Sequence, residues 1–337
     1  MSPPTHPPLI ADSHLENCLE DLGRSVASEV EDAMRPVGPR EDDAVVAASE
    51  PTSPPYVCTL PEDARLCAEK ELGEDADKRE ELIREVQEWL KREAAYLRAR
   101  TDDLSVLKFL RGCKFDRVAT QTKLRNFYEM RAKVPEWYSK RDPELPEVQE
   151  MLKMGTFLPL LDKNDRGQQV VLIRAAVHDP RKHQQNDLFK TSNMLVDLMV
   201  HEDELISVYG VVAIVDLKGV SLGHALQMTP SIIWKAVHAW QDCYPVRIKS
   251  MNFINAPSYV DVVLNVFRKF MTKKMAKRIL VHGYNIQSLH KVVSPEILPK
   301  EYGGTKGKLE ELIGYWKKVA MEKREWFIAE EKYKADI

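Results

Sequence analysis

The sequence of 337 residues predicts an α/β protein in which a small all-helical module precedes a mostly parallel sheet. Three observations predict this order. Apolar residues recur at helical spacing in three successive segments between residues 76 and 135. After about residue 155, short runs rich in Val and Ile alternate with helical stretches, which is typical of parallel sheets. The first 60 residues hold nine of the twenty prolines and few aromatic residues, so they bury too little apolar surface to fold.

The predicted division therefore has three parts. Residues 1–74 are expected to form a disordered, Pro-rich tail, 75–140 a helical module, and 141–337 an α/β domain that ends in a helix. In the module, the apolar face of the first helix comprises Leu82, Ile83, Val86, Trp89 and Leu90. Asp102 or Asp103 is expected to cap the second helix, which ends near Gly112. The third helix begins at Asp116 and ends at Pro135.

The strands of the domain are predicted at 156–161, 168–175, 211–217, 250–256 and 279–284. The turn-rich sequence DKNDRG joins the first two strands into a hairpin. Helices are expected around 225–242, over 257–280 and at 308–327. In the strand at 211–217, Val211, Ala213 and Val215 share one face while Val212 and Ile214 share the other, so both faces of the sheet are apolar.

The predicted helix at 257–280 combines an apolar stripe with a run of cations. The stripe comprises Val260, Val263, Leu264, Phe267 and Met271. The cations Arg268, Lys269, Lys273, Lys274, Lys277 and Arg278 stand against Asp261 alone, so the local charge is +5. Such a segment fits an apolar interior on one side and an anionic partner on the other.

Overall composition excludes several classes of protein. The net charge of −3 argues against a nucleic-acid-binding chain. No window reaches the roughly 18 uninterrupted apolar residues of a membrane span, and no secretory signal opens the chain. The five cysteines are scattered without a CxxC pair, which is typical of a reduced, cytoplasmic protein.

Motifs for common catalytic and metal chemistry are incomplete. DLKG at 216–219 resembles a nucleotide-sensing loop, but GGTKGKL at 303–309 is one residue short of a phosphate-binding loop. DKNDRG lacks oxygen ligands at two calcium positions, which Arg166 and Ile173 occupy. Neither His201 with Glu202 and Glu204 nor His224 with His238 has the spacing of zinc ligands, and no GxSxG sequence is present. The sequence therefore predicts a binding protein without a cofactor or a metal, and not an enzyme.

Four stretches together resemble the CRAL-TRIO lipid-transfer family: FLRGCKFD, DLKGVSLGHALQMTPS, YPVRIKSMNFINAP and ILPKEYGG. The resemblance extends over about residues 80–330. It implies a helical module at 75–140 on a lipid-binding domain at 141–337, whose sheet floors an apolar cavity closed by a mobile gate helix. The gate corresponds to the helix at 257–280. The implied function is non-enzymatic, intracellular binding and transfer of one small hydrophobic molecule that is tocopherol-, retinoid- or carotenoid-like.

The resemblance also implies which residues face the ligand. It assigns the odd-numbered face of the strand at 211–217 to the cavity. The complete set of implied pocket residues is Phe189, Ser192, Val196, Val211, Ala213, Val215, Trp240, Tyr244, Met251, Phe253, Val263, Phe267 and Met271. Plain core packing would produce the same pattern, since a filled interior and a cavity have the same apolar residues.

Family members bind phosphatidylinositol bisphosphates through cations that correspond here to Arg247, Lys249, Lys274 and Arg278. Lys249 stands where the family has an arginine, so the charge is kept but the bidentate hydrogen bonding of a guanidinium is lost. A further family arginine corresponds to Cys113, so Arg111 or Lys114 is the expected substitute. The implied protein is a monomer that associates reversibly with phosphoinositide membranes, where docking opens the gate. The alternative is a lipid-sensing regulatory module that contacts a signalling protein.

Overall fold

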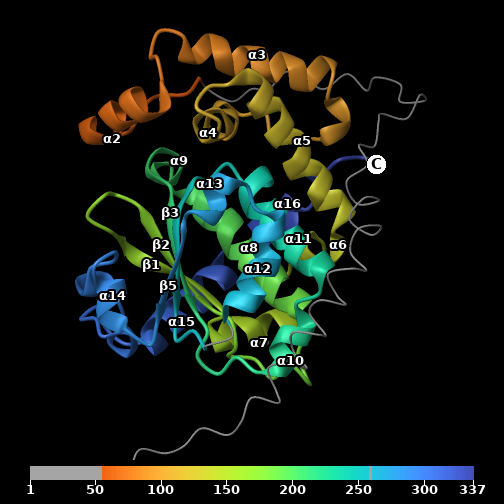
Figure 1. Ribbon diagram of the computed structural model, residues 1–337. Coiled ribbons are helices and arrows are strands. Elements are labelled where there is room, and N and C mark those ends of the chain that lie inside the picture. Colours follow the sequence, from red (N-terminus) through yellow and green to blue (C-terminus); the bar gives the residue numbers. More distant parts are fainter. Residues whose placement is uncertain (1–54, 258–259) are drawn as a thin grey trace, which may run out of the picture.

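The computed structural model describes residues 55–257 and 260–337 (Figure 1). Its centre is a five-stranded sheet in the order β1-β2-β3-β4-β5. The strands are β1 (Phe157–Lys163), β2 (Gln169–Arg174), β3 (Val211–Asp216), β4 (Ile248–Ile254) and β5 (Ile279–Gly283). β1 and β2 form the predicted antiparallel hairpin, and the other three pairings are parallel. The predicted α/β fold with a mostly parallel sheet is therefore confirmed.

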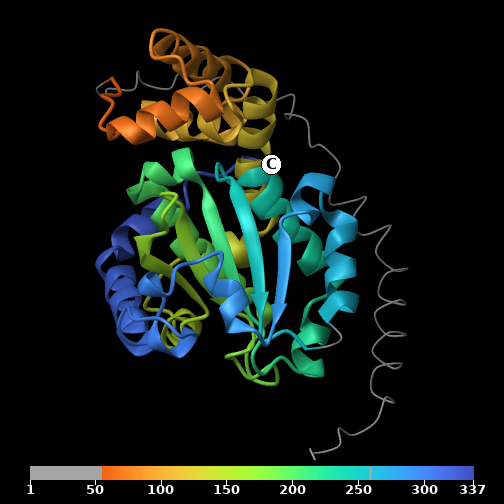
Figure 2. The ribbon, with the colours of Figure 1, turned by 60° about the vertical axis from the view of Figure 1, so that its left-hand side comes forward.

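Helices cover both faces of the sheet, and the module lies beyond one end of it (Figures 1 and 2). The module and the segment before it comprise α2 (Glu62–Cys67), η1 (Ala68–Leu72), α3 (Arg79–Arg92), η2 (Ala95–Leu97), α4 (Asp103–Gly112), α5 (Arg117–Lys133) and α6 (Pro135–Tyr138). The domain adds α7 (Pro146–Met154), α8 (Gln185–Glu202), α9 (Leu205–Tyr209), α10 (Leu222–Gln227), α11 (Pro230–His238), η3 (Ala239–Cys243), α12 (Val260–Phe270) and α13 (Lys273–Ala276). The remaining elements are α14 (Ile286–His290), η4 (Pro295–Ile297), η5 (Lys300–Tyr302), α15 (Leu309–Glu322) and α16 (Arg324–Glu330).

Strand β3 separates two hydrophobic cores because its side chains alternate between the faces of the sheet. Val211 and Ala213 pack in a cluster with residues of α8 and α11. Val212 and Ile214 pack in a second cluster with residues of α14 and α15. All six residues of β3 are buried, so the strand is apolar on both faces, as the sequence predicts.

The predicted caps set the first turns of two helices in the module. Asp102 accepts a hydrogen bond from Ser105 N at 3.0 Å, and Asp116 accepts one from Ala119 N at 2.9 Å. Each carboxylate satisfies an N–H group that has no partner within its own helix. Pro135 begins α6 directly after α5, where its missing N–H costs nothing.

Replacing Asp116 by Ala should lower the free energy of unfolding by about 1 kcal/mol, because the first turn of α5 then loses its cap. Asp116→Asn should retain most of that energy, since the amide oxygen also accepts from the backbone. Urea denaturation followed by circular dichroism measures both variants. Equal losses in the two variants would show that the charge of Asp116, rather than its capping bond, stabilises the helix.

Two predicted helices are interrupted in the structure. The helix predicted at 257–280 ends at Phe270, and the hydroxyl of Thr272 caps α13 by accepting from Met275 N at 3.2 Å. The helix predicted around 225–242 begins again at Pro230, where Thr229 accepts from Ile232 N at 3.3 Å. A threonine cap satisfies the first N–H groups of a new helix, so the chain turns at low cost.

The structure also differs from the prediction of a disordered tail over residues 1–74. Residues 62–72 form α2 and η1, in which Ala64, Ala68 and Leu72 are buried against Val208 of α9. Residues 62–72 contribute only three buried apolar side chains, and their partner Val208 lies more than 130 residues further along the chain. The part of the predicted tail before residue 55 lies outside the described residues.

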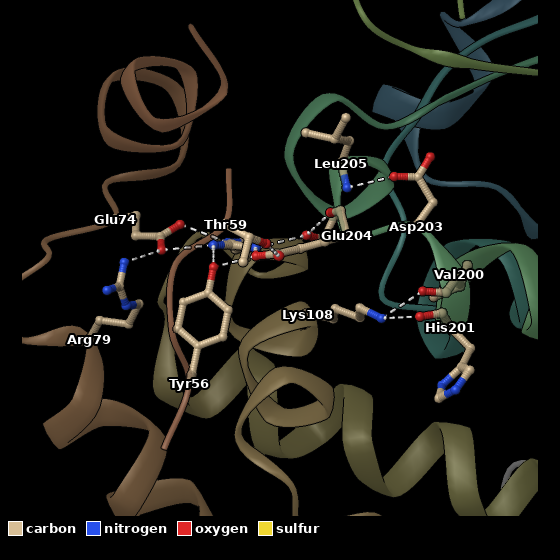
Figure 3. Close-up of polar contacts among 12 residues, drawn as sticks. Tyr56, Thr59, Glu74, Arg79, Lys108, Val200, His201, Asp203, Glu204 and Leu205 are labelled. Carbon is tan, nitrogen blue, oxygen red and sulfur yellow. Dashed lines mark hydrogen bonds and ion pairs between the residues drawn. The ribbon is translucent and has the colours of Figure 1, made fainter. Parts of the chain in front are cut away.

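A buried ion cluster fastens this segment to both the module and the domain (Figure 3). The guanidinium of Arg111 binds Glu74 at 2.7 and 2.9 Å and Glu204 at 2.6 Å. Tyr56 donates its hydroxyl to the carboxylate of Glu204. Burial would destabilise the cation if it were alone, so its two carboxylate partners are needed to hold it there.

Candidate lipid-binding cavity and basic surface

A cavity of about 240 Å³ lies between the sheet and helices α8, α10, α11 and α12. Its floor comes from alternate residues of the strands: Ile173 in β2, Val211, Ala213 and Val215 in β3, and Ile248, Met251 and Phe253 in β4. Its roof is α12, whose residues Val260, Val263, Leu264 and Phe267 complete the lining, followed by Met271 and Met275. Almost all of the lining is aliphatic, aromatic or thioether, so the cavity suits an apolar guest.

Eleven of the thirteen implied pocket residues line this cavity: Phe189, Ser192, Val211, Ala213, Val215, Trp240, Met251, Phe253, Val263, Phe267 and Met271. Val196 and Tyr244 do not line it. Val196 is fully buried in the packed core beneath α8. Tyr244 is also buried, and its hydroxyl donates to Asn193 at 3.4 Å. Assigning these two residues to the cavity was therefore wrong in this structure.

Several lining residues were not assigned from the sequence. They include Gln185, Leu188, Leu217, Val220, His224, Ala225, Met228, Val237 and Met275. Five of them lie in α10 or in the loops directly before and after it, where neither strand alternation nor the apolar stripe of a long helix gives a signal. The apolar spacing of Val237 relative to Trp240, at i and i+3, could have identified that residue.

His224 is held by local hydrogen bonds. Its Nδ1 lies 2.8 Å from the hydroxyl of Ser221, and its Nε2 lies 3.0 Å from the carbonyl oxygen of His178. The imagined partner His238 instead contacts Asp242 at 3.2 Å. Within residues 55–257 and 260–337, no group of three or more His, Cys, Asp or Glu side chains has the arrangement of a metal site.

Helix α12 lies between the cavity and solvent, and its residues follow an amphipathic pattern. Val260 and Leu264 are buried, whereas Asp261, Asn265 and Lys269 are exposed on the opposite side. The apolar stripe therefore faces the cavity, as expected of a lid that contributes part of the lining.

The basic surface lies beside α12 and comprises Arg247, Lys249, Lys273, Lys274, Lys277 and Arg278. The three lysines of α13 and its end, at 273, 274 and 277, are exposed. The other three cations are partly buried and already have partners. Arg247 donates to the carbonyl of Val208, and Arg278 donates to the carbonyl of Ile248.

Lys249 forms an ion pair with Glu71, with 3.5 Å between Nζ and the carboxylate oxygen. Burial lowers the pKa of Lys249, and the neighbouring charge of Arg247 lowers it further. Burial also lowers the pKa of Arg247. Both shifts show that these two cations are held in a partly desolvated place, where an anion is attracted more strongly than at an open surface.

The two expected substitutes for the arginine missing at Cys113 differ in availability. Arg111 is fully buried in its ion pairs with Glu74 and Glu204, so it is unavailable to a headgroup. Lys114 is exposed at the turn after α4, with a φ of 55°. The suggestion that Arg111 takes this role is therefore wrong, because a structural cluster already uses its charge.

Comparison with known proteins agrees with this geometry. The pattern of the CRAL/TRIO domain matches residues 153–304, and that of a Pinta-like UBA domain matches residues 75–148. "Alpha-tocopherol transfer protein-like" of Mus musculus is 32% identical over 281 residues, which cover 83% of this chain and 80% of the relative. The chain belongs to the CRAL/TRIO family.

"Clavesin-2" of Homo sapiens is 31% identical over 243 residues, which cover 72% of this chain and 73% of that protein. The crystal structure of Sfh5 matches with a TM-score of 0.48 and 15% identity, covering 73% of this chain and 98% of that one. Membership of the CRAL/TRIO family means that the chain belongs to a group that binds and transfers hydrophobic ligands and is typically non-enzymatic. Among the described residues, no helix is long and apolar enough to span a bilayer.

Proposed function

We propose that this CRAL/TRIO protein carries one neutral hydrophobic molecule, tocopherol-, retinoid- or carotenoid-like, and exchanges it at membranes that contain phosphoinositides. The observation that carries the proposal is an apolar cavity roofed by an amphipathic helix, α12, beside a basic surface. In this proposal the protein acts in the cytoplasm as a monomer and associates reversibly with the bilayer.

The lining supports a neutral guest. Arg174 is the one charged residue among the described residues that border the cavity, and its guanidinium donates to the carbonyl of Met154 at 2.6 Å. Ser192 and Gln185 supply polar groups without charge. A carboxylate or phosphate inside the cavity would lose its hydration and meet a single cation that already donates to backbone carbonyls, which makes a charged lipid costly to bind.

Opening of α12 is the step that membrane contact must favour. Burying its four cavity-lining side chains together with Met271 is worth on the order of 8–12 kcal/mol before ordering costs, so the lid stays closed in water. A bilayer offers the same side chains another apolar environment. Each exposed lysine near an anionic membrane contributes roughly 1 kcal/mol of attraction. The basic surface therefore holds α12 against the bilayer, where opening costs least.

Gentle purification of the chain from its native tissue, followed by organic extraction and mass spectrometry, tests the ligand. One neutral lipid at about one equivalent per chain is expected, because the apolar cavity admits a single guest. Vesicles containing phosphatidylinositol bisphosphate should release it faster than vesicles of phosphatidylcholine alone. Recovery of a mixture of phospholipids, or equal release to both vesicles, would contradict the proposal.

A further inference from the structure

The segment formed by α2 and η1, residues 62–72, places an acidic surface against two cations of the basic surface. The segment contains four acidic and two basic residues, so its net charge is −2. It lies across the end of the sheet at which β3 begins (Figure 2). Cys67 and Glu71, one helical turn apart, face Arg247 and Lys249 there.

The ion pair between Glu71 and Lys249 is weak enough to exchange. The nitrogen and oxygen are 3.5 Å apart, and the side chain of Glu71 is 56% exposed. Exposed ion pairs of this kind contribute between 0 and about 1 kcal/mol. The pair therefore holds Lys249 in place without locking it.

The position of Lys249 depends on the close approach of its own chain to β3. A Cβ added at Gly210 would lie 2.3 Å from the carbonyl oxygen of Arg247 and 3.3 Å from the side chain of Lys249. Gly210 also has a φ of 84°, which glycine adopts without strain. The glycine therefore lets Arg247 and Lys249 pack closely against the start of β3.

The remaining contacts of the segment keep it close to the basic surface when that pair is broken. Its buried face packs on Val208, and Asp63 accepts a hydrogen bond from the hydroxyl of Tyr209 at 2.8 Å. Beyond its end, Glu74 is tied to Arg111. The effective concentration of the Glu71 carboxylate at Lys249 is therefore high.

We propose that residues 62–72 act as an intramolecular competitor for the headgroup site, with the carboxylate of Glu71 occupying the place of a lipid phosphate on Lys249. Docking on a phosphoinositide then requires the phosphate to displace this carboxylate. A phosphomonoester has a charge of about −1.5 to −2 at neutral pH against −1 for Glu71, so it prevails where its local concentration is high. The inference rests on the proposed docking of Lys249 on a phosphoinositide. It adds that the phosphate must be concentrated enough to displace the carboxylate of Glu71.

The variant Glu71→Gln tests the competition in the full-length chain. Binding to phosphatidylcholine vesicles that contain phosphatidylinositol bisphosphate should tighten by about two- to five-fold, as loss of an exposed ion pair allows. Glu69→Gln is the matched control, because Glu69 is exposed on the same π-helix and forms no ion pair among the described residues. Equal affinity of the Glu71→Gln and control variants would overturn the inference.

Hydrogen exchange provides a second readout that needs no substitution. Because its buried face stays packed on Val208, backbone amides in 62–72 should exchange at the same rate with vesicles that contain the bisphosphate and with vesicles of phosphatidylcholine alone. Faster exchange with the bisphosphate alone would show that the whole segment leaves the sheet, and would overturn a local exchange of carboxylate for phosphate. Absence of vesicle binding in the unmodified chain would instead remove the proposed docking itself, so the two failures are distinguishable.

Discussion

Charge reversal at Lys274 and Lys277 should weaken binding to phosphatidylinositol bisphosphate vesicles by about a thousand-fold. Each reversal removes about 1 kcal/mol of attraction to the anionic surface and adds a repulsion of similar size, so two reversals amount to about 4 kcal/mol. Both lysines are exposed and have no ion-pair partner among the described residues, so the fold should be unaffected. Co-sedimentation with vesicles at fixed ionic strength measures the change.

Arg278 is a poorer choice for this experiment, since its guanidinium donates to the carbonyl of Ile248 between β4 and β5. The control is the double reversal of Lys91 and Lys318, which are exposed on α3 and α15. It changes the net charge by the same amount at sites away from the basic surface. A loss of binding as large in the control would show that overall charge, and not this surface, attracts the membrane.

Replacing Phe267 by Asp should reduce the affinity for the hydrophobic ligand by more than a hundred-fold. Phe267 lines the cavity from α12, and a carboxylate there would be desolvated beside an apolar guest without a counter-charge. An unpaired buried charge costs about 3–5 kcal/mol or forces the helix away from the cavity. Extraction and mass spectrometry of the purified variant should recover little ligand.

Asn265→Asp supplies the same charge on the exposed side of α12, so this control should retain the ligand. Thermal unfolding of both variants without ligand separates loss of binding from loss of folding. Full ligand occupancy in Phe267→Asp would mean that α12 does not contact the guest.

Local periodicity predicts which residues share one face of a strand or a helix, and the family resemblance supplies the cavity side and the position of the lid. Alternation puts Val211, Ala213 and Val215 on one face of β3, and the three residues line the cavity, as the resemblance implies. Helix faces are less certain, as Val196 shows. It lies one turn beyond Ser192 on α8, but it packs into the core while Ser192 borders the cavity.

Long-range polar contacts could not be predicted from the sequence. The pairing of Glu71 with Lys249 spans 178 residues, and no local pattern encodes it. The same is true of Arg111, which the sequence offers as a cation free to bind phosphate and the structure buries between two carboxylates. Distinguishing an available cation from a committed one requires the tertiary structure.

The ion pair between Arg111 and Glu204 crosses the predicted boundary between the helical module and the sheet domain. Glu204 belongs to the sheet domain, yet the charge that neutralises it comes from α4 of the module. The other end of the chain repeats the arrangement: Glu330 of α16 pairs with Arg100, and the backbone N–H of Ala335 donates to the carbonyl of Tyr128. A fragment starting at residue 141 would therefore expose two carboxylates without their cations. The sequence predicts a boundary near residue 140, but two ion pairs and a backbone hydrogen bond join the parts on either side of it.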